Sequence, residues 1–158
     1  MIKAKRYNAR LLSFILNENL YGINRMAKTK GLSFMMLNNI KITIDPKYVP
    51  DRSSPTQSYF LFSYHVVIEN RSSVVVRLIS RYWHITDGVG NSEDIYGPGV
   101  VGKKPTLKPN TSFEYTSFCP LKTPMGYMGG SYRMANEDGE ESDVTIPKFR
   151  LLASQVLN

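Results

Sequence analysis

Cysteine and histidine are nearly absent from this chain of 158 residues, which has one cysteine, Cys119, and two histidines, His65 and His84. A single cysteine excludes a disulfide framework within the chain. Cysteine and histidine together are also too few to supply the four ligands of a structural zinc site. We therefore expect no metal site of that class, and no feature of the sequence predicts a cofactor.

Long hydrophobic runs are also missing. No apolar stretch approaches the roughly 20 residues that a membrane-spanning helix needs, so we expect no membrane span. Hydrophobic residues make up 42% of the chain and charged residues 21%, which is the balance of a folded globular domain rather than a disordered one. A chain of this length fits one domain with a sizeable core, and we expect it to be soluble and cytoplasmic.

Acidic residues are scarce only at the start of the chain. Residues 1–41 contain eight lysines and arginines against one acid, Glu18, whereas residues 42–158 contain twelve residues of each sign. The net charge of +7 therefore lies in the first 41 residues. We divide the chain into a basic N-terminal extension, residues 1–35, and an electrically balanced domain, residues 36–158.

Three interpretations of the extension remain open. The segment Arg10–Leu16 is basic and apolar, as a targeting presequence would be. The extension could also form a short amphipathic helix that docks on the domain or on a partner, or it could be poorly ordered, which we favour. We expect no nucleic-acid partner, because the aromatic residues of the extension do not alternate with its basic residues as a stacking platform requires.

From Ile40 onward the hydrophobic pattern has a period of two, which is typical of half-buried strands. Turn residues separate the segments that show it, and no helical pattern lies between them. The spacing predicts an all-β fold, an immunoglobulin- or fibronectin-III-like β-sandwich of about seven antiparallel strands. The expected strands are residues 40–44, 59–70, 74–87, 94–101, 112–118, 128–134 and 142–151.

Local features of these segments carry further expectations. The turn between residues 59–70 and 74–87 predicts that these two strands form a consecutive antiparallel pair. Gly129 and Gly130 predict a bulge or a close approach of two backbones. Pro147 predicts an edge strand or a bulge, and Trp83 fits a core position.

Five motifs, in this order and spacing, resemble the ApaG family over about residues 42–152. The resemblance implies a fibronectin-III-like sandwich and an association with tolerance of cobalt and magnesium. It implies no established catalytic activity, and the fusion of such domains to other modules in eukaryotes suggests protein–protein interaction. The motifs are Ser80–Asp87, Tyr96–Gly102, Tyr115–Ser117, Thr123–Gly126 and Gly130–Met134.

Gly97, Gly99 and Gly102 form a G-x-G-x-x-G pattern, which also marks dinucleotide-binding loops. That function needs a helix starting on the loop, and the Pro105 that follows argues against one. Glycine amides can instead form an anion nest, with Lys103 and Lys104 adding positive charge. We favour a constrained turn. Under the alternative, Gly99→Val should fold normally and lose phosphate binding.

No catalytic constellation is predicted. A nucleophile needs a base within reach, Cys119 fits a buried position, and His84 and Asp87 point to opposite faces of a strand. The acidic cluster Glu137, Asp138, Glu140 and Glu141 could attract a divalent cation, but we favour a solvated hairpin tip. Arg77 and Arg81 are expected to share one strand face, where they either cover aromatic surface or form a cationic patch that recognises a carboxylate or phosphate.

These features together predict a non-enzymatic binding domain that contacts an unidentified protein partner. The alternative is a binder of phosphate, pyrophosphate or a nucleotide through the Gly97–Gly102 loop, with hydrolysis as an extension of that role. The two hypotheses differ in where they place the site: the first places it on a sheet face or an edge strand, and the second places it on the loop.

Overall fold

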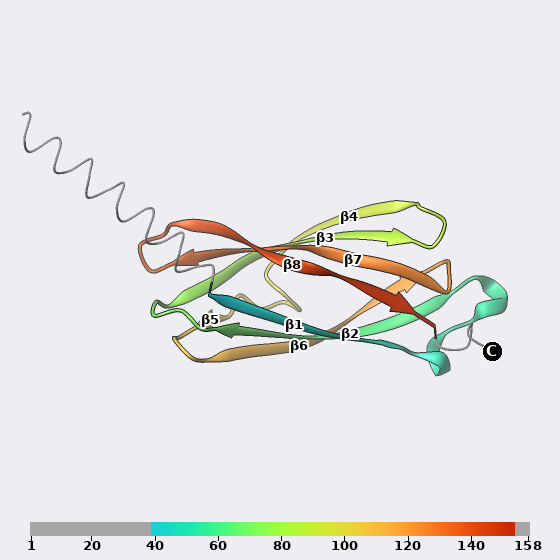
Figure 1. Cartoon of the computed structure of the whole chain (residues 1–158), viewed down its shortest axis with the longest axis horizontal. Helices are drawn as coiled ribbons and strands as arrows, with labels where there is room; N and C mark the ends of the chain where they lie inside the picture. Colours follow the sequence, from blue (N-terminus) through green and yellow to red (C-terminus); the bar gives the residue numbers. More distant parts are fainter. Residues whose placement is uncertain (1–38, 154–158) are drawn as a thin grey trace, which may run out of the picture. The chain divides into compact units, whose positions relative to one another are not determined.

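Antiparallel strands account for nearly all regular structure in the computed structural model, which describes residues 39–153 (Figure 1). The expectations for the extension, residues 1–35, lie outside this range. Two single-turn 3-10 helices, η1 and η2, join the first two strands. The elements are β1 Ile40–Tyr48, η1 Pro50–Arg52, η2 Pro55–Gln57, β2 Phe60–Asn70, β3 Val76–Asp87, β4 Ser92–Pro98, β5 Thr106–Leu107, β6 Ser112–Leu121, β7 Met125–Asn136 and β8 Glu141–Leu152.

The strands form two packed sheets, which confirms the predicted all-β sandwich. One sheet has the order β1-β2-β6, and the other has the order β4-β3-β7-β8, with β5 paired to β3. Figure 1 shows the two layers, with β4 at the outer edge of the second sheet and β8 beside β1. The predicted strands all exist, and the sequence pattern missed only β5, which has two residues.

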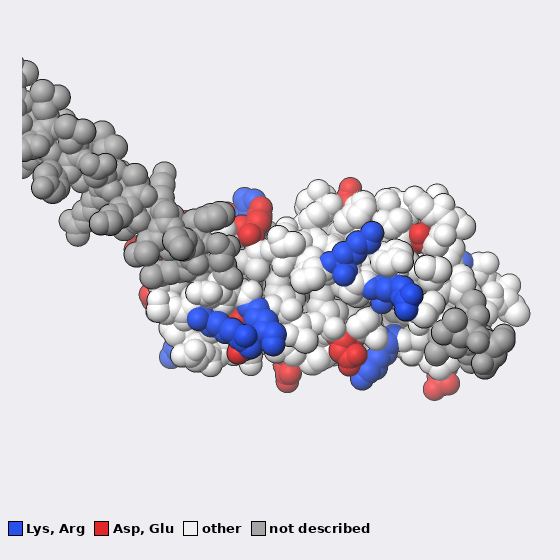
Figure 2. Space-filling model, viewed as in Figure 1, with Lys and Arg blue, Asp and Glu red and all other residues white. Residues whose placement is uncertain are grey.

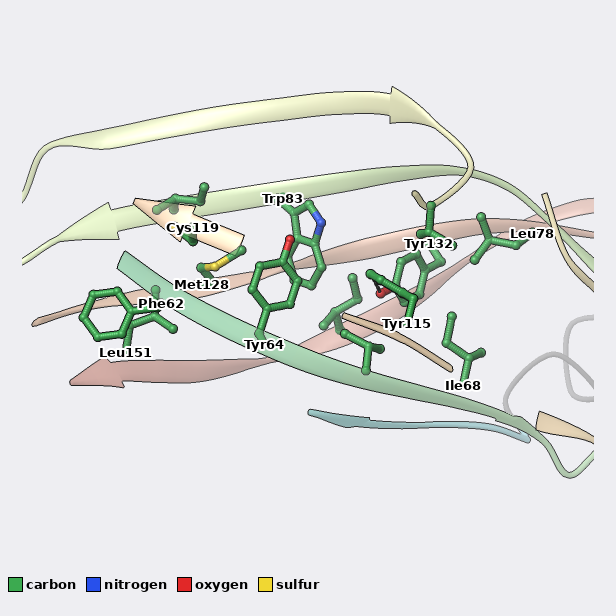
Figure 3. Close-up of a cluster of buried hydrophobic side chains, with 14 of the residues drawn as sticks. Phe62, Tyr64, Ile68, Leu78, Trp83, Tyr115, Cys119, Met128, Tyr132 and Leu151 are labelled. Carbon is green, nitrogen blue, oxygen red and sulfur yellow. Dashed lines mark hydrogen bonds between the residues drawn. The ribbon is translucent and has the colours of Figure 1, made fainter. Parts of the chain in front are cut away.

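The core fills the space between the sheets with side chains from both (Figure 3). Trp83 is 2% exposed, as predicted, and contacts Tyr64, Tyr132 and Phe149 edge-on. Cys119 is buried, and burial raises the pKa of its thiol to about 12. A thiol of this kind stays protonated and serves as packing.

The predicted pairing of the second and third strands is wrong, because β2 and β3 lie in different sheets. Each strand has a strongly apolar inner face. The inner faces of β2 and β3 cover each other when the two strands lie on opposite sides of the core. Asn70 holds the crossover between them. Its fully buried side chain donates to the carbonyl oxygens of Val74 and Leu107 and accepts hydrogen bonds from Ser72.

The two backbone irregularities predicted for the last strands are present. The β7–β8 register shifts between Met128 and Gly130. A Cβ on Gly130 would lie 2.0 Å from the carbonyl oxygen of Tyr82, so β3 and β7 approach closely at that point. Pro147 lies in β8, an edge strand of the second sheet, at the same bulge.

Surface charge on the domain is mixed. On the face seen in Figure 2, lysine and arginine side chains are interspersed with aspartate and glutamate, in keeping with the equal numbers of each sign in residues 42–158. Among the described residues, no helix is both long enough and apolar enough to cross a membrane.

Candidate functional site

The outward-facing surface of the β4-β3-β7-β8 sheet, here called the outer face, collects aromatic and hydrogen-bonding side chains. The strand registers place Tyr96, Tyr82, Ser131 and Thr145 in one row across it. The rings of Tyr82 and Tyr96 stack with their centroids 4.8 Å apart. Tyr96 is 73% exposed, which is unusual for a side chain with so much apolar surface.

Small residues on β7 hollow out this face. Gly129 and Ser131 stand between the bulky side chains of β3 and those of β8, so two depressions open beside Tyr82. One has a volume of about 330 Å³ and extends to Arg133, and the other, of about 360 Å³, extends to Lys148. The outer face is therefore a shallow trough with a tyrosine at its centre.

A chain of hydrogen bonds runs along one side of the trough. Asp94 Oδ1 accepts hydrogen bonds from the Tyr82 hydroxyl at 3.0 Å and from His84 Nδ1 at 2.7 Å. His84 Nε2 lies 3.3 Å from Thr86 Oγ1, which is 3.1 Å from Ser92 Oγ. These bonds fix the orientation of exposed side chains, because each one is held by a neighbour on the same face.

The same contacts set the charge state of Asp94. The hydrogen bond from His84, and then the one from Tyr82, holds the pKa of the Asp94 carboxyl below its ordinary value. Conversely, the bond to Asp94 raises the pKa of the Tyr82 hydroxyl. At neutral pH the network therefore contains a carboxylate and a protonated tyrosine.

A hydroxyl, an imidazole and a carboxylate in this order also occur in nucleophilic triads. Here His84 and Asp94 have 48% and 51% of their side chains exposed, and solvent screens the electrostatic activation on which such triads depend. The network therefore lacks the shielded environment of such triads.

This network was not predicted from the sequence, where Asp87 was the only partner considered for His84. Asp87 instead caps the β3–β4 turn, accepting from the amides of Val89 and Asn91 and from the Asn91 side chain. The turn residues could have predicted the pairing of His84 with Asp94. Pairing Asp87 with Asn91 and counting back along both strands places His84 opposite Asp94.

Charged side chains at the ends of the trough contact neighbouring side chains, and Arg133 is neutralised by an acidic one. Arg133 donates two hydrogen bonds of 2.9 Å to the carboxylate of Asp143, which faces it on β8. The Lys148 ammonium lies 4.6 Å from the centre of the Tyr127 ring. The trough therefore offers aromatic surface and hydrogen-bonding groups more than net charge.

The two arginines predicted to form one patch lie on opposite faces of β3, so this expectation is wrong. The β3–β7 register shifts at Ile79, and a bulge of one residue exchanges the faces of all positions after it. Arg77 is opposite Ala135 and exposed. Arg81 is opposite the buried Tyr132, and its Nη1 donates to the carbonyl oxygens of Pro98 and Gly99.

The glycine motif of residues 97–102 has a packing explanation at two of its positions. A Cβ on Gly97 would lie 2.8 Å from Arg81 Nη1, and one on Gly99 would lie 2.1 Å from the Lys103 carbonyl oxygen. Gly99 also has φ +55°, a conformation that favours glycine. Contrary to expectation, Gly99→Val would therefore disturb the loop itself and cannot test phosphate binding alone.

The loop amides are largely committed to the protein. Gly99 N–H donates to the Ile79 carbonyl, and Val100 and Lys103 bond each other's carbonyls. Val101 and Gly102, both with positive φ, form the tip of a two-residue turn of the type I′ class. An anion nest here would rely on the tip amides of Val101 and Gly102, with the exposed Lys103 and Lys104 beside them.

Metal ligands do not gather in the described part of the chain. Among residues 39–153, no three or more histidine, cysteine, aspartate and glutamate side chains are arranged to hold a metal ion. In the acidic segment 137–141, the Asn136 side chain accepts hydrogen bonds from the amides of Asp138 and Glu140. This arrangement is that of a β-hairpin turn, as predicted.

Comparison with known proteins gives one consistent result. The family model described as ApaG domain matches residues 50–136. The protein ApaG of Agrobacterium fabrum is 50% identical over 116 residues, which cover 73% of this chain and 89% of the relative. The protein ApaG of Mesorhizobium japonicum is 50% identical over 113 residues, covering 72% of this chain and 87% of the relative.

A solved structure shows the same relationship as the sequence relatives. The crystal structure of an ApaA protein from Bordetella pertussis superposes with a TM-score of 0.72 at 42% identity. The match covers 73% of this chain and 94% of that one. The sandwich described above is therefore also the fold of the Bordetella pertussis protein.

Proposed function

The chain belongs to the ApaG family, and we propose that it acts in the cytoplasm as a non-enzymatic binding module whose outer face contacts a partner protein. The observation that carries this proposal is the stacked pair Tyr82 and Tyr96 at the centre of a hollowed, hydrogen-bonding sheet face. Exposed tyrosines of this kind are enriched where proteins bind one another, because they combine large apolar area with a polar tip.

The groups around the tyrosines fit recognition of a protein surface. Hydroxyl, imidazole and carboxylate groups held in fixed orientations supply specificity, while the aromatic pair supplies most of the contact area. The tolerance of cobalt and magnesium that the family resemblance implies would then follow indirectly, from what the partner does when it is bound. This assignment places no metal on the chain itself.

Capture experiments with the full chain test this proposal. Tyr96→Ala removes the most exposed ring of the outer face, and Tyr59→Ala is the matched control, because Tyr59 is 41% exposed and lies beside η2, outside the outer-face sheet. We expect wild type and Tyr59→Ala to retain the same protein from an extract of the source cells. Tyr96→Ala should retain at least about tenfold less of it. Equal capture by all three proteins contradicts the proposal.

Phosphate or nucleotide binding by the Gly97–Gly102 loop is the second candidate. Its support is the pair of tip amides at Val101 and Gly102 with two lysines next to them. The test is titration calorimetry of the full chain with pyrophosphate, using the double variant Lys103→Ser/Lys104→Ser in place of Gly99→Val. A dissociation constant of about 10 μM or tighter, lost in the double variant, would support it, and the absence of heat would exclude it.

A further inference from the structure

Strand β4 ends the sheet order β4-β3-β7-β8, so one of its edges pairs with no strand among the described residues. The Asp87 amide donates to the Asn91 carbonyl and the Gly99 amide donates to the Ile79 carbonyl. Hydrogen-bonded pairs alternate along an antiparallel ladder, and the register between these two points is unbroken. Residues 93, 95 and 97 therefore bond β3, and the backbones of Ser92, Asp94 and Tyr96 face outward.

Two other edge strands of the sandwich, β8 and β1, carry features that hinder pairing, and a third, β6, carries Pro120 next to its last residue. β8 contains Pro147, a bulge and the basic residues Lys148 and Arg150. β1 contains Pro46 and lies against β8. Proline, lysine and bulges are the usual means by which proteins block exposed edges. β4 has no lysine and no bulge, and its one proline is its last residue.

The charges on β4 are acidic. Asp94 uses one carboxylate oxygen, Oδ1, for both of its hydrogen bonds. The side chain of Glu93, next to it, forms no hydrogen bond or ion pair within residues 39–153. A second copy of this chain added to the same edge would bring two carboxylates from each copy into one short seam, which is unfavourable, whereas a basic segment would be attracted.

We propose that the free edge of β4 takes up an extended, basic segment of a partner protein as an added strand. This proposal rests on the proposed function and specifies how the partner is held. The amides and carbonyls of Ser92, Asp94 and Tyr96 bond the added strand. Because side chains alternate between faces, those of the same three residues lie on the outer face, where a basic side chain meets Asp94 and an apolar one packs against the Tyr96 ring.

The probe for this proposal is a displayed library of random peptides of about twelve residues, selected on the full chain. Each selected peptide is then measured against Tyr96→Ala and Tyr96→Pro. Both variants lose the ring, but only proline lacks the outward-facing amide, and it removes no bond to β3. We expect peptides enriched in lysine and arginine that bind Tyr96→Pro at least about tenfold more weakly than Tyr96→Ala.

Amide hydrogen exchange gives a second measurement on the wild-type chain, so the result does not depend on whether the proline variant folds. In the free protein, the amides of Ser92, Asp94 and Tyr96 should exchange fast and those of residues 93, 95 and 97 slowly. Bound peptide should slow the first three by at least about tenfold and leave the others unchanged.

The outcomes separate this inference from the proposed function. Peptides that depend on Tyr82 yet bind both Tyr96 variants equally, and that leave the three outward amides unprotected, overturn the added strand while the binding role of the outer face stands. Selected peptides with no basic residues overturn the stated chemistry of the partner. A library that yields no peptide dependent on Tyr82, Tyr96 or the edge overturns both proposals.

Discussion

At the scale of single residues, the outer face depends on side chains that hold one another in place. About half of the Asp94 side chain is exposed, yet two donors fix its carboxylate. A carboxylate held by hydrogen bonds is stabilised in its charged form, which is why its pKa falls. The same bonds keep His84 and Tyr82 in one arrangement, and we expect a partner to bind that arrangement without paying to order it.

Replacing His84 by alanine should raise the pKa of Asp94 towards its ordinary value, because the largest cause of its depression is the bond from His84. A depressed carboxyl pKa stabilises the fold above the pKa of the unfolded chain, and this contribution is lost as pH falls through the native pKa. The variant should therefore lose less stability than wild type between about pH 5 and pH 3. NMR titration of the side-chain carboxyl carbon measures the pKa directly.

Asp87 serves as the internal control in the same titration. Its pKa is lowered mainly by the Asn91 side chain, which His84 does not contact. The pKa of Asp87 should therefore stay unchanged in His84→Ala. A similar rise for both aspartates would mean that the substitution acted through the fold and would contradict the local account.

At the scale of strands, β7 contains two adjacent glycines, Gly129 and Gly130, which have different constraints. A Cβ on Gly130 would lie 2.0 Å from the Tyr82 carbonyl oxygen, in the backbone of β3. On Gly129 the nearest atom would be the Lys148 Cα at 3.3 Å, on the edge strand β8. A Cβ on Gly130 would force the central strands β3 and β7 apart. A Cβ on Gly129 would need only a small shift of the edge strand β8.

Gly130→Ala should therefore destabilise the domain by about 3 kcal/mol or more, or prevent folding. Gly129→Ala should cost about 1 kcal/mol or less and fill part of the depression beside His84 and Tyr82. Urea unfolding monitored by fluorescence of the single tryptophan, Trp83, compares the two variants. If both glycines tolerate alanine equally, the close approach of β3 and β7 is not what fixes Gly130.

The strands themselves could be predicted, because each buries one face and so repeats its apolar residues with a period of two. What the pattern could not show directly was the bulge at Ile79, although it left a trace. The buried residues Val76 and Leu78 occupy even positions and Trp83 and Ile85 odd ones, so the inner face changes parity between them. Recognising that change would have placed Arg77 and Arg81 on opposite faces.

The trough could not be predicted for a different reason. It is formed where His84 on β3 lies opposite Gly129 on β7, and their register depends on contacts between segments far apart in the sequence. A local pattern indicates that adjacent glycines mark a bulge or a close approach of two backbones. It does not say which side chains stand beside the space that they leave.

At the scale of the whole molecule, the sandwich depends on how its two sheets are joined. Most contacts between them are apolar and non-directional, so they hold the sheets together without fixing their relative position. Tyr115 on β6 and Tyr132 on β7 differ, since their hydroxyls bond each other across the core (Figure 3). Burial raises the pKa of both hydroxyls, so each stays protonated at any ordinary pH.

A double-mutant cycle with Tyr115→Phe and Tyr132→Phe measures this link between the sheets. Each single substitution leaves one buried hydroxyl without its partner and should cost about 1–3 kcal/mol of unfolding free energy. The double substitution removes both polar groups and leaves none unpaired. Its cost should therefore be smaller than the sum of the two single costs by about 1 kcal/mol or more, as measured by urea unfolding.

Additive costs would mean that the two hydroxyls contribute independently and that the apolar core alone positions the sheets. Non-additive costs would mean that the bond couples β6 to β7, the strand that forms the floor of the trough. In that case the double variant should also loosen the packing of the second sheet against the first. Faster amide exchange in β7 of the double variant than in wild type would measure that loosening, and it would connect the buried core to the surface proposed to bind the partner.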